Sequence, residues 1–426
     1  MKHILLLALT FFTTASAWAQ SAEEISQIDP LYYYELYRPY PVERITDNTP
    51  APKGYKPFYI SHLGRHGSRW NVLRRLYDKP LALFAEAHRA GELTATGERF
   101  YADWQRIAAD AQGRYGDLSP LGAEEHRGIA NRMYHSYPEV FTTHKGKPAH
   151  IDCRSTTVPR CILSMASFAG ELARLAPEAD IAMEASAANA HYLAAFADLN
   201  SIKDEAKPLS DSVRRANMPD QQRFIRSLFR DGSRVAASIK DTNDFMYDMY
   251  LANAILAATP HTGILTLEYL FTTNELAALW RCSNMRRYIL TGPSAHFVDA
   301  VRGGAKPLIR NIIESADRAI ATGDEQATLR FGHDVTIIPL VNLLGIECGS
   351  TVTDDYATIG YKWQVDVVTP MASNVQMVFF RNKAGDVLVK VLFCEREQRL
   401  DKAVGEPVNG CYYHWKDIRN YLEKKL

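Results

Sequence analysis

The sequence has no excess of charge of either sign, because 49 Lys and Arg residues stand against 49 Asp and Glu residues among 426. A chain without a basic surplus lacks the electrostatic signature of dedicated nucleic-acid or membrane-surface binders, so neither partner is expected. The sequence also lacks a Cys-x-x-Cys unit and any His/Cys cluster with zinc spacing, which argues against a metal site. Beyond the N-terminus, no segment is apolar for the about 20 residues that a membrane-spanning helix needs.

The N-terminus has the composition of a secretory signal peptide. Residues 2–3 are basic, residues 4–14 are nearly all apolar, and residues 17–19 (A-W-A) match the small-x-small pattern of a cleavage site. The alternative is a short membrane anchor, but the apolar run is too short to span a bilayer. We therefore expect residues 1–19 to be removed and the mature chain, starting near Gln20, to be periplasmic or secreted.

Cysteine is scarce but even in number, with six in the whole chain. In an exported protein six cysteines permit up to three disulfides, in 15 connectivities that the sequence does not distinguish. The cysteines are Cys153, Cys161, Cys282, Cys348, Cys394 and Cys411.

Hydrophobic periodicity predicts strands that alternate with helices, which implies an α/β sandwich. We expect strands at 58–63, 150–153, 328–331, 375–381 and 387–394, the last two as an antiparallel pair at a sheet edge. We expect helices at 70–76, 159–175, 274–290, 307–322 and 335–344, and two more within 94–137. Residues 20–57, rich in Tyr and Pro, indicate an arm that wraps the core. Residues 184–260 are helical in pattern and predict an inserted cap, leaving 20–183 and 261–426 as the α/β core.

The sharpest local feature is residues 63–69 (L-G-R-H-G-S-R), which directly follow a predicted strand. Ligands bind at the carboxyl ends of strands in open α/β sheets, and a helix starting there would offer free N–H groups to an anion. Arg65 and Arg69 supply planar guanidinium forks that match phosphate oxygens, and Gly67 would let a phosphate approach the backbone. The two cations favour a neutral His66, which is a potential nucleophile. The alternative is a basic turn that binds sulfate or nothing.

Two further segments carry the same kind of chemistry. Arg160 lies just inside a predicted helix start and could give phosphate a third guanidinium, although on its own such an arginine is more often a surface charge. Residues 332–334 (G-H-D) again join a strand to a helix, where His333 could bind phosphate and Asp334 could protonate a leaving oxygen. Alone, such a pair is usually a turn or a helix cap.

Together these segments resemble the histidine acid phosphatase family, the branch that holds acid phosphatases, histidine phytases and multiple inositol polyphosphate phosphatases. Residues 65–69 resemble its R-H-G-x-R signature, residues 118–122 (L-S-P-L-G) its Leu-Thr-x-x-Gly segment, residues 154–168 its R-S-T…R…S segment, and residues 331–334 its G-H-D motif.

This resemblance implies a three-layer α/β sandwich with a central mixed sheet, similar to the phosphoglycerate mutase fold, plus a smaller and mainly helical inserted domain. It also implies a two-step reaction. His66 attacks phosphorus, Asp334 protonates the leaving group, and water then hydrolyses the phosphohistidine. The phosphoryl oxygens would be held by Arg65, Arg69, Arg160 and His333, so that no metal or other cofactor is needed.

The substrate class rests on conflicting signals. The inositol polyphosphate phosphatase branch usually carries His-Ala-Glu where this chain has residues 333–335 (H-D-V), yet residues 316–319 and 339–345 are most similar to that branch. We expect a small phosphate monoester, with an inositol polyphosphate as the first candidate and general acid phosphatase activity as the alternative. Such a polyanion would need further cations around the pocket. The candidates are Arg74, Arg75, Lys79 and Arg154, whose alternative is a solvated or ion-paired surface position.

Two other functions compete with the phosphatase. A phosphoglycerate-mutase-type enzyme shares Arg-His-Gly, but the signal peptide and Asp334 argue against it. An exported protein that only binds phosphorylated ligands would have little use for His66 as nucleophile or Asp334 as acid. No obligate protein partner is evident, and we expect an acidic or mildly acidic optimum because the general acid must carry a proton.

Overall fold

The computed structural model describes residues 32–42, 45, 48–143, 146–194, 196–261 and 267–426. The predicted signal peptide at 1–19 lies outside these residues. In the described part of the chain, no helix is both long and apolar enough to cross a bilayer.

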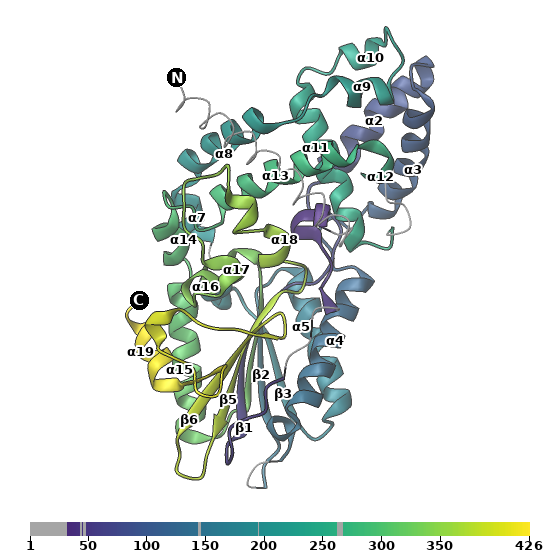
Figure 1. The fold of residues 1–426 in the computed structure, drawn as a ribbon. Helices are drawn as coiled ribbons and strands as arrows, with labels where there is room; N and C mark the ends of the chain where they lie inside the picture. The colour runs from purple at the N-terminus through teal and green to yellow at the C-terminus, as the bar shows by residue number, and fades with distance from the viewer. Residues whose placement is uncertain (1–31, 43–44, 46–47, 144–145, 195, 262–266) are drawn as a thin grey trace, which may run out of the picture.

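The centre of the molecule is one mixed sheet with the strand order β3-β2-β4-β1-β5-β6-β7, and β8 pairs with β6 (Figure 1). Neighbours among the first four strands of this order run parallel, whereas β5 to β8 pair in antiparallel fashion. The predicted antiparallel pair is confirmed as β5 and β6. Its predicted place at the sheet edge is wrong, because β5 also pairs with β1, and β6 with β7 and β8. The strands are β1 (Lys56–Arg65), β2 (His150–Ser155), β3 (Asp180–Ala185), β4 (Ala327–Gly332), β5 (Asn374–Arg381), β6 (Val387–Phe393), β7 (Arg396–Glu397) and β8 (Tyr412–His414).

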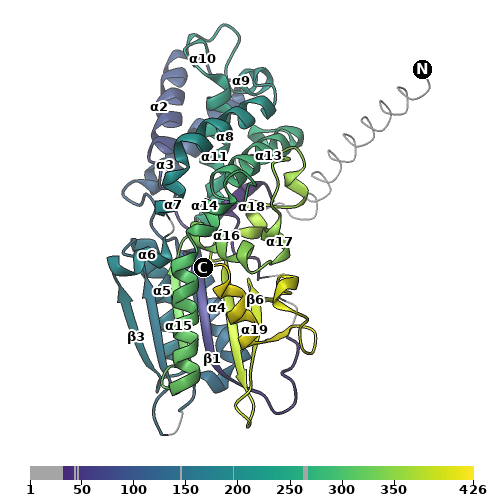
Figure 2. The ribbon, with the colours of Figure 1, turned by 90° about the vertical axis from the view of Figure 1, so that its left-hand side faces the viewer.

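Helices cover both faces of the sheet and complete the predicted three-layer sandwich (Figure 1, Figure 2). Helices α4 (Pro120–Ser136) and α5 (Pro159–Leu175) lie on one face, and α15 (Lys306–Thr322) and α19 (Trp415–Glu423) on the other. Their ends follow local signals. The Ser119 side chain caps α4 by accepting from the Gly122 amide, and Gly323 ends α15 in the left-handed conformation at φ 67°.

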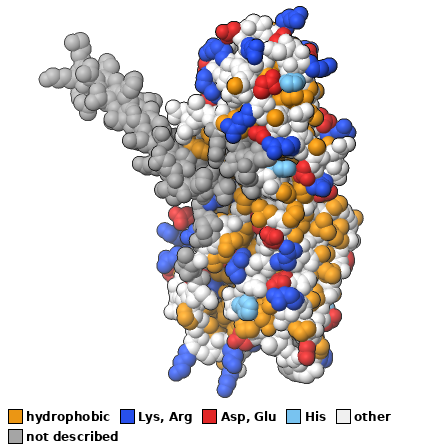
Figure 3. Space-filling view, turned by 90° about the vertical axis from the view of Figure 1, so that its right-hand side faces the viewer, with side chains coloured by type: hydrophobic (Ala, Val, Ile, Leu, Met, Phe, Trp, Pro, Cys, Tyr) orange, Lys and Arg blue, Asp and Glu red, His pale blue; other side chains and the backbone are white. Residues whose placement is uncertain are grey.

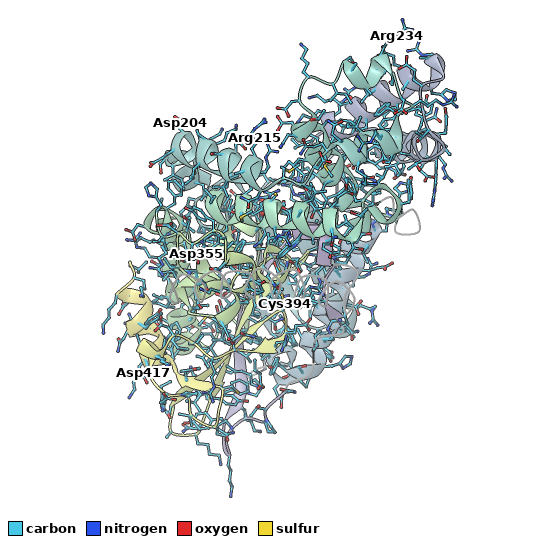
Figure 4. The ribbon with its side chains drawn as sticks, turned by 45° about the horizontal axis from the view of Figure 1, so that its top comes forward. Asp204, Arg215, Arg234, Asp355, Cys394 and Asp417 are labelled. Atoms are coloured by element: carbon cyan, nitrogen blue, oxygen red, sulfur yellow. The ribbon has the colours of Figure 1, made fainter. Side chains whose placement is uncertain are left out.

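A helical part lies beyond the carboxyl ends of the parallel strands, at the top of Figure 1. Segments from separate parts of the sequence build it, because α2 packs against α3 and α11, and α3 against α9. Its main helices are α2 (Arg75–Ala90), α3 (Ala95–Ala111), α8 (Lys203–Asn217), α9 (Gln222–Leu228), α10 (Arg234–Ala237), α11 (Thr242–Ala254) and α13 (Thr273–Leu290). Strand β3 reaches Ala185, just inside the predicted insertion at 184–260, and the boundaries of that insertion remain a prediction. Figure 4 shows Arg234 at the outer end of the helical part and Asp417 on α19 beside the sheet.

Short helices complete the connections between these elements. They are α6 (Ala190–Leu193), α7 (Phe196–Ser201), α12 (Leu267–Leu270), α14 (Val298–Gly303), α16 (Asp334–Leu343), α17 (Glu347–Ser350) and α18 (Val365–Val368). The 3-10 helices are η1 (Tyr32–Tyr37), η3 (Pro138–Phe141), η4 (Ala187–Asn189), η5 (Ile255–Ala258), η6 (Ile359–Tyr361) and η7 (Lys402–Val404).

The structure corrects the helix predicted at 70–76. Helix α2 begins only at Arg75, and the preceding residues form an irregular loop. The Trp70 amide donates to the Asp117 carbonyl at 3.1 Å, and its indole N–H donates to Asp110 at 3.0 Å. Because these contacts come from a distant part of the chain, they hold the loop out of the helical conformation that its own sequence favours.

The predicted disulfides are wrong for this structure, in which all six cysteines are free thiols. The sulfur atoms have other neighbours. Cys161 Sγ lies 3.4 Å from the Gly332 carbonyl oxygen, and Cys282 Sγ lies 3.6 Å from that of Arg214. The even cysteine number therefore reflects free thiols, five of them buried, rather than a covalent framework.

Candidate active site

Three neighbouring parallel strands bring the sequence motifs to one edge of the sheet. Strand β4 lies between β1 and β2, so the carboxyl ends of all three are adjacent. His66 directly follows β1, Arg160 lies in the first turn of α5 after β2, and Asp334 begins α16 after β4. The His66 amide donates to the Gly332 carbonyl at 3.0 Å, which ties two of the motifs together. The strand order thus assembles the site that the separate motifs predicted.

The loop after β1 is fixed by its packing against α4. An ideal Cβ at Gly67 would lie 2.5 Å from the Gly122 carbonyl oxygen, so Gly67 is required for this close approach of two backbones. This differs from the prediction that Gly67 makes room for phosphate. The buried Glu125 carboxylate accepts from the Ser68 amide at 2.7 Å, the Ser68 hydroxyl at 2.8 Å and the Tyr40 amide at 2.9 Å. The loop is therefore held in place before any ligand arrives.

Unused guanidinium donors define an anion site. Arg65 Nη1 donates to the carbonyl oxygens of Leu36 and Thr369, but its buried Nε and Nη2 have no acceptor in the described part of the protein. The Nε atoms of Arg69 and Arg160 are buried without an acceptor as well. Buried donors that lack an acceptor are costly, and an anion such as phosphate would satisfy them.

The imidazole of His66 is held neutral. Burial lowers its pKa well below the usual value, and the nearby cations Arg65, Arg69 and Arg160 lower it further. His66 Nδ1 lies 3.0 Å from the Gly67 carbonyl oxygen, which only accepts, so Nδ1 carries the proton in this hydrogen bond. The lone pair is then on Nε2, where a nucleophile needs it.

His333 and Asp334 lie beside the nucleophile. The ring centroids of His66 and His333 are 5.8 Å apart, and burial, followed by the charge of Arg160, lowers the His333 pKa to about 4. Burial acts to raise the pKa of Asp334, but the charges of Arg65 and Arg287 outweigh it and the pKa lies below the ordinary value. Without a ligand, Asp334 is therefore a carboxylate at mildly acidic pH.

The chain matches a known protein family over most of its length. A family model described as histidine phosphatase superfamily (branch 2) matches residues 61–394, which include all of these motifs. The chain belongs to this superfamily. Among curated proteins, none matches it.

Solved structures of this fold extend the comparison over nearly the whole chain. The Bifidobacterium longum multiple inositol polyphosphate phosphatase in complex with inositol hexasulfate superposes with a TM-score of 0.76 at 19% identity, over 92% of this chain and 97% of that one. The phytase from D. castellii gives a TM-score of 0.69 at 13% identity, over 93% and 85% of the two chains. At these identities the likeness shows the fold alone.

Each of the three predicted pocket arginines of this histidine phosphatase has an acidic partner. Arg74 pairs with Asp78 at 2.7 Å, Arg75 with Asp248 at 2.6 Å, and Arg154 with Asp152 at 2.8 Å. Lys79 is exposed and lines a cavity of about 370 Å³ between α2 and α11. None of the four is among the principal charges that act on His66 or Asp334. The alternative of ion-paired surface charges describes the three arginines.

Four other residues at this site were not predicted from the sequence. They are Glu35, Tyr37, Glu125 and Arg287. Glu125 stands close to the start of a helix, where an acidic residue is common, and the other three lie outside every motif. Among the described residues, no group of three or more His, Cys, Asp or Glu side chains could hold a metal ion.

Proposed function

We propose that this histidine phosphatase hydrolyses phosphate monoesters through a phosphohistidine at His66, with inositol polyphosphates as the preferred substrates. The observation that carries the proposal is the convergence of a neutral, buried histidine with three arginines whose buried donors lack acceptors among the described residues. A nucleophile surrounded by unused phosphate donors suits phosphoryl transfer, in which catalysis is mainly positioning and charge stabilisation.

The first step forms a bond between His66 Nε2 and phosphorus while the bond from phosphorus to the leaving oxygen breaks. Asp334 gives its proton to that oxygen, so the leaving group departs as a neutral alcohol. Arg65, Arg69, Arg160 and His333 bind the phosphoryl oxygens as negative charge shifts onto the leaving group. A water molecule then attacks phosphorus, the P–N bond breaks, and the proton of the water passes to Asp334, which is ready for the next cycle.

The substrate class is supported by the relatives rather than by this chain's own motif. The Bifidobacterium longum protein carries inositol polyphosphate phosphatase in its name, and a second related structure is called a phytase. The His333-Asp334 pair is equally suited to small phosphate monoesters, which are the second candidate. Lys, Arg, Asp and Glu are mixed over the face shown in Figure 3, without a broad basic area. We also propose export, on the composition of residues 1–19.

The test is phosphate release at pH 5 with a chelator present, from inositol hexakisphosphate and from phenyl phosphate. We expect release from both, and its loss in His66→Ala but not in His88→Ala, an exposed histidine on α2. Release from phenyl phosphate alone would keep the mechanism and exclude the inositol substrate. Tight binding without release from either would favour a protein that only binds phosphorylated ligands.

A further inference from the structure

Each of the four residues from Glu35 to Arg38 in the N-terminal segment contacts a different part of the protein. Glu35 pairs with α13, the Leu36 carbonyl accepts from Arg65 at 2.8 Å, and the Tyr37 ring lies 5.5 Å from the Arg69 guanidinium carbon. Arg38 pairs with Asp366 of α18 at 3.3 Å. This segment therefore links the phosphate-binding arginines to a helix of the helical part.

Glu35 is the most constrained residue of this segment. Its backbone has φ 56° and ψ −140°, which a residue other than glycine adopts only when its surroundings hold it there. Its side chain is fully buried, and Oε1 accepts from the Ser283 hydroxyl at 2.7 Å and from Arg287 Nε at 2.8 Å. Strained backbone conformations of this kind are concentrated at functional sites, which suggests a functional role for the contact between Glu35 and Arg287.

Arg287 is held by only one edge of its guanidinium. Its Nε binds Glu35, whereas no protein acceptor in the described part of the chain binds Nη1 or Nη2, and a quarter of the side chain is exposed. Glu35 is followed directly by Leu36, whose carbonyl accepts from Arg65, so this short segment brings Arg287 to the phosphate-binding end of the site. In agreement, Arg287 and Asp334 are each among the charges that act on the other. The N–H groups of Nη1 and Nη2 thus remain available to a ligand, on the side of the site where the leaving group of a substrate would lie.

We infer that Arg287 is a specificity-determining residue that binds a second phosphate on the leaving group, and that Glu35 is its positioning residue. The inference rests on the proposed phosphatase function and names the feature of the substrate that the site selects. An arginine suits this task because its planar fork gives two parallel hydrogen bonds to one phosphate while its Nε remains bound to Glu35. The competing explanation is an ion pair that only joins the N-terminal segment to α13.

The experiment compares two substrates, inositol monophosphate and inositol hexakisphosphate, which differ only in the number of phosphates on the ring. We expect Arg287→Met to lower kcat/KM for inositol hexakisphosphate at least 10-fold more than for inositol monophosphate, mainly through KM, because the effect of its charge on Asp334 falls on both substrates alike. Arg287→Lys should recover part of the loss, and Glu35→Gln should act in the same direction but more weakly. The matched control is Arg286→Met, because the neighbouring Arg286 instead faces Asp211 at 3.6 Å.

Binding of inositol hexasulfate by calorimetry makes the test independent of turnover. We expect Arg287→Met to weaken this binding at least 10-fold while binding of inorganic sulfate is unchanged. Equal losses for both ligands and both substrates, or a lowered melting temperature alone, would overturn the inference and leave a structural ion pair. If the wild type binds inositol hexasulfate but releases phosphate from no substrate, the proposed function fails while the binding comparison still decides the role of Arg287.

Discussion

At the scale of single residues, Asp334 must carry a proton to act as general acid, although its pKa in the free enzyme is low. Burial raises its pKa, but the combined charges of Arg65, Arg287, His333 and Arg69 outweigh burial and lower it, so the free enzyme holds a carboxylate. A bound phosphate dianion neutralises these cations and adds negative charge, which raises the pKa of Asp334 and lets it carry the proton that the leaving group needs. The pH profile of kcat reports the enzyme–substrate complex, and that of kcat/KM reports the free enzyme. The apparent pKa on the alkaline side should therefore be higher in the kcat profile than in the kcat/KM profile.

Replacing Asp334 tests this role directly. We expect Asp334→Asn to lower kcat on an alkyl phosphate by about 10²-fold or more, because a general acid contributes that much when the leaving group is poor. An aryl phosphate with a good leaving group should lose less than about 10-fold, since it departs without a proton. Steady-state kinetics on the two substrates measure this difference. Equal losses of kcat on both would show that Asp334 is not the proton donor.

The residues of this site differ in how far the sequence reveals them. His66, Arg65 and Arg69 lie in one short motif, and His333 and Asp334 in another, so residue type and spacing are enough to indicate phosphate chemistry. Arg287 and Glu35 are 252 positions apart and belong to no motif. Only the packing of α13 on the N-terminal segment brings them together, and a local pattern does not encode it.

At the scale of elements, helices with a clear apolar face were predicted best. The helices predicted at 159–175 and 307–322 match α5 and α15, because periodicity and end signals agree there. The helix predicted at 70–76 was wrong because Trp70 binds Asp110 and Asp117 across the loop. Tertiary contacts of this kind override local propensity and are invisible in a short window of sequence.

The link between α4 and the loop after β1 gives a prediction at this scale. In Glu125→Gln, one carboxylate oxygen becomes an NH₂ group that faces the donors on Ser68 and Tyr40. We expect the free energy of unfolding to fall by about 1–3 kcal/mol, since a buried donor loses its acceptor. Because the loop carries His66, kcat/KM should fall to the same extent for good and poor leaving groups.

Denaturant unfolding and the two-substrate kinetics measure these effects. Glu124→Gln is the matched control, because Glu124 is the neighbouring acid but is exposed. Unchanged stability and activity in Glu125→Gln would mean that the loop is held by the packing of Gly67 on Gly122 alone.

At the scale of the whole molecule, two buried histidines make the fold sensitive to acid. His62 on β1 and His126 on α4 pack against Phe168 and Phe331, with ring centroids 5.3 to 6.5 Å apart. None of their ring nitrogens has a hydrogen-bond partner among the residues that the structure describes. Burial lowers the pKa of both to about 3, and for His62 the neighbouring His126 and Arg330 lower it further. Both rings are therefore neutral in the folded protein at mildly acidic pH.

The sign of the effect follows from linkage. In the unfolded chain each histidine titrates near pH 6.5, so below that pH the unfolded state binds more protons than the folded state. Stability is then complete above pH 6.5 and falls steadily toward pH 3. At pH 5 each histidine lowers the free energy of unfolding by about 2 kcal/mol relative to pH 7.5. The acidic pH that favours protonation of Asp334 thus weakens the fold that holds it.

Replacing one of these rings with an apolar ring should remove its share of the acid sensitivity. Phenylalanine keeps the aromatic packing of His126 and does not titrate, so the stability of His126→Phe relative to wild type should rise by about 2 kcal/mol between pH 7.5 and pH 5. Denaturant unfolding at the two pH values measures this change. His135→Phe, an exposed position on the same helix, should show none. If the stabilities of His126→Phe and wild type change in parallel with pH, the acid sensitivity lies in the carboxylates and in the histidines of the active site instead.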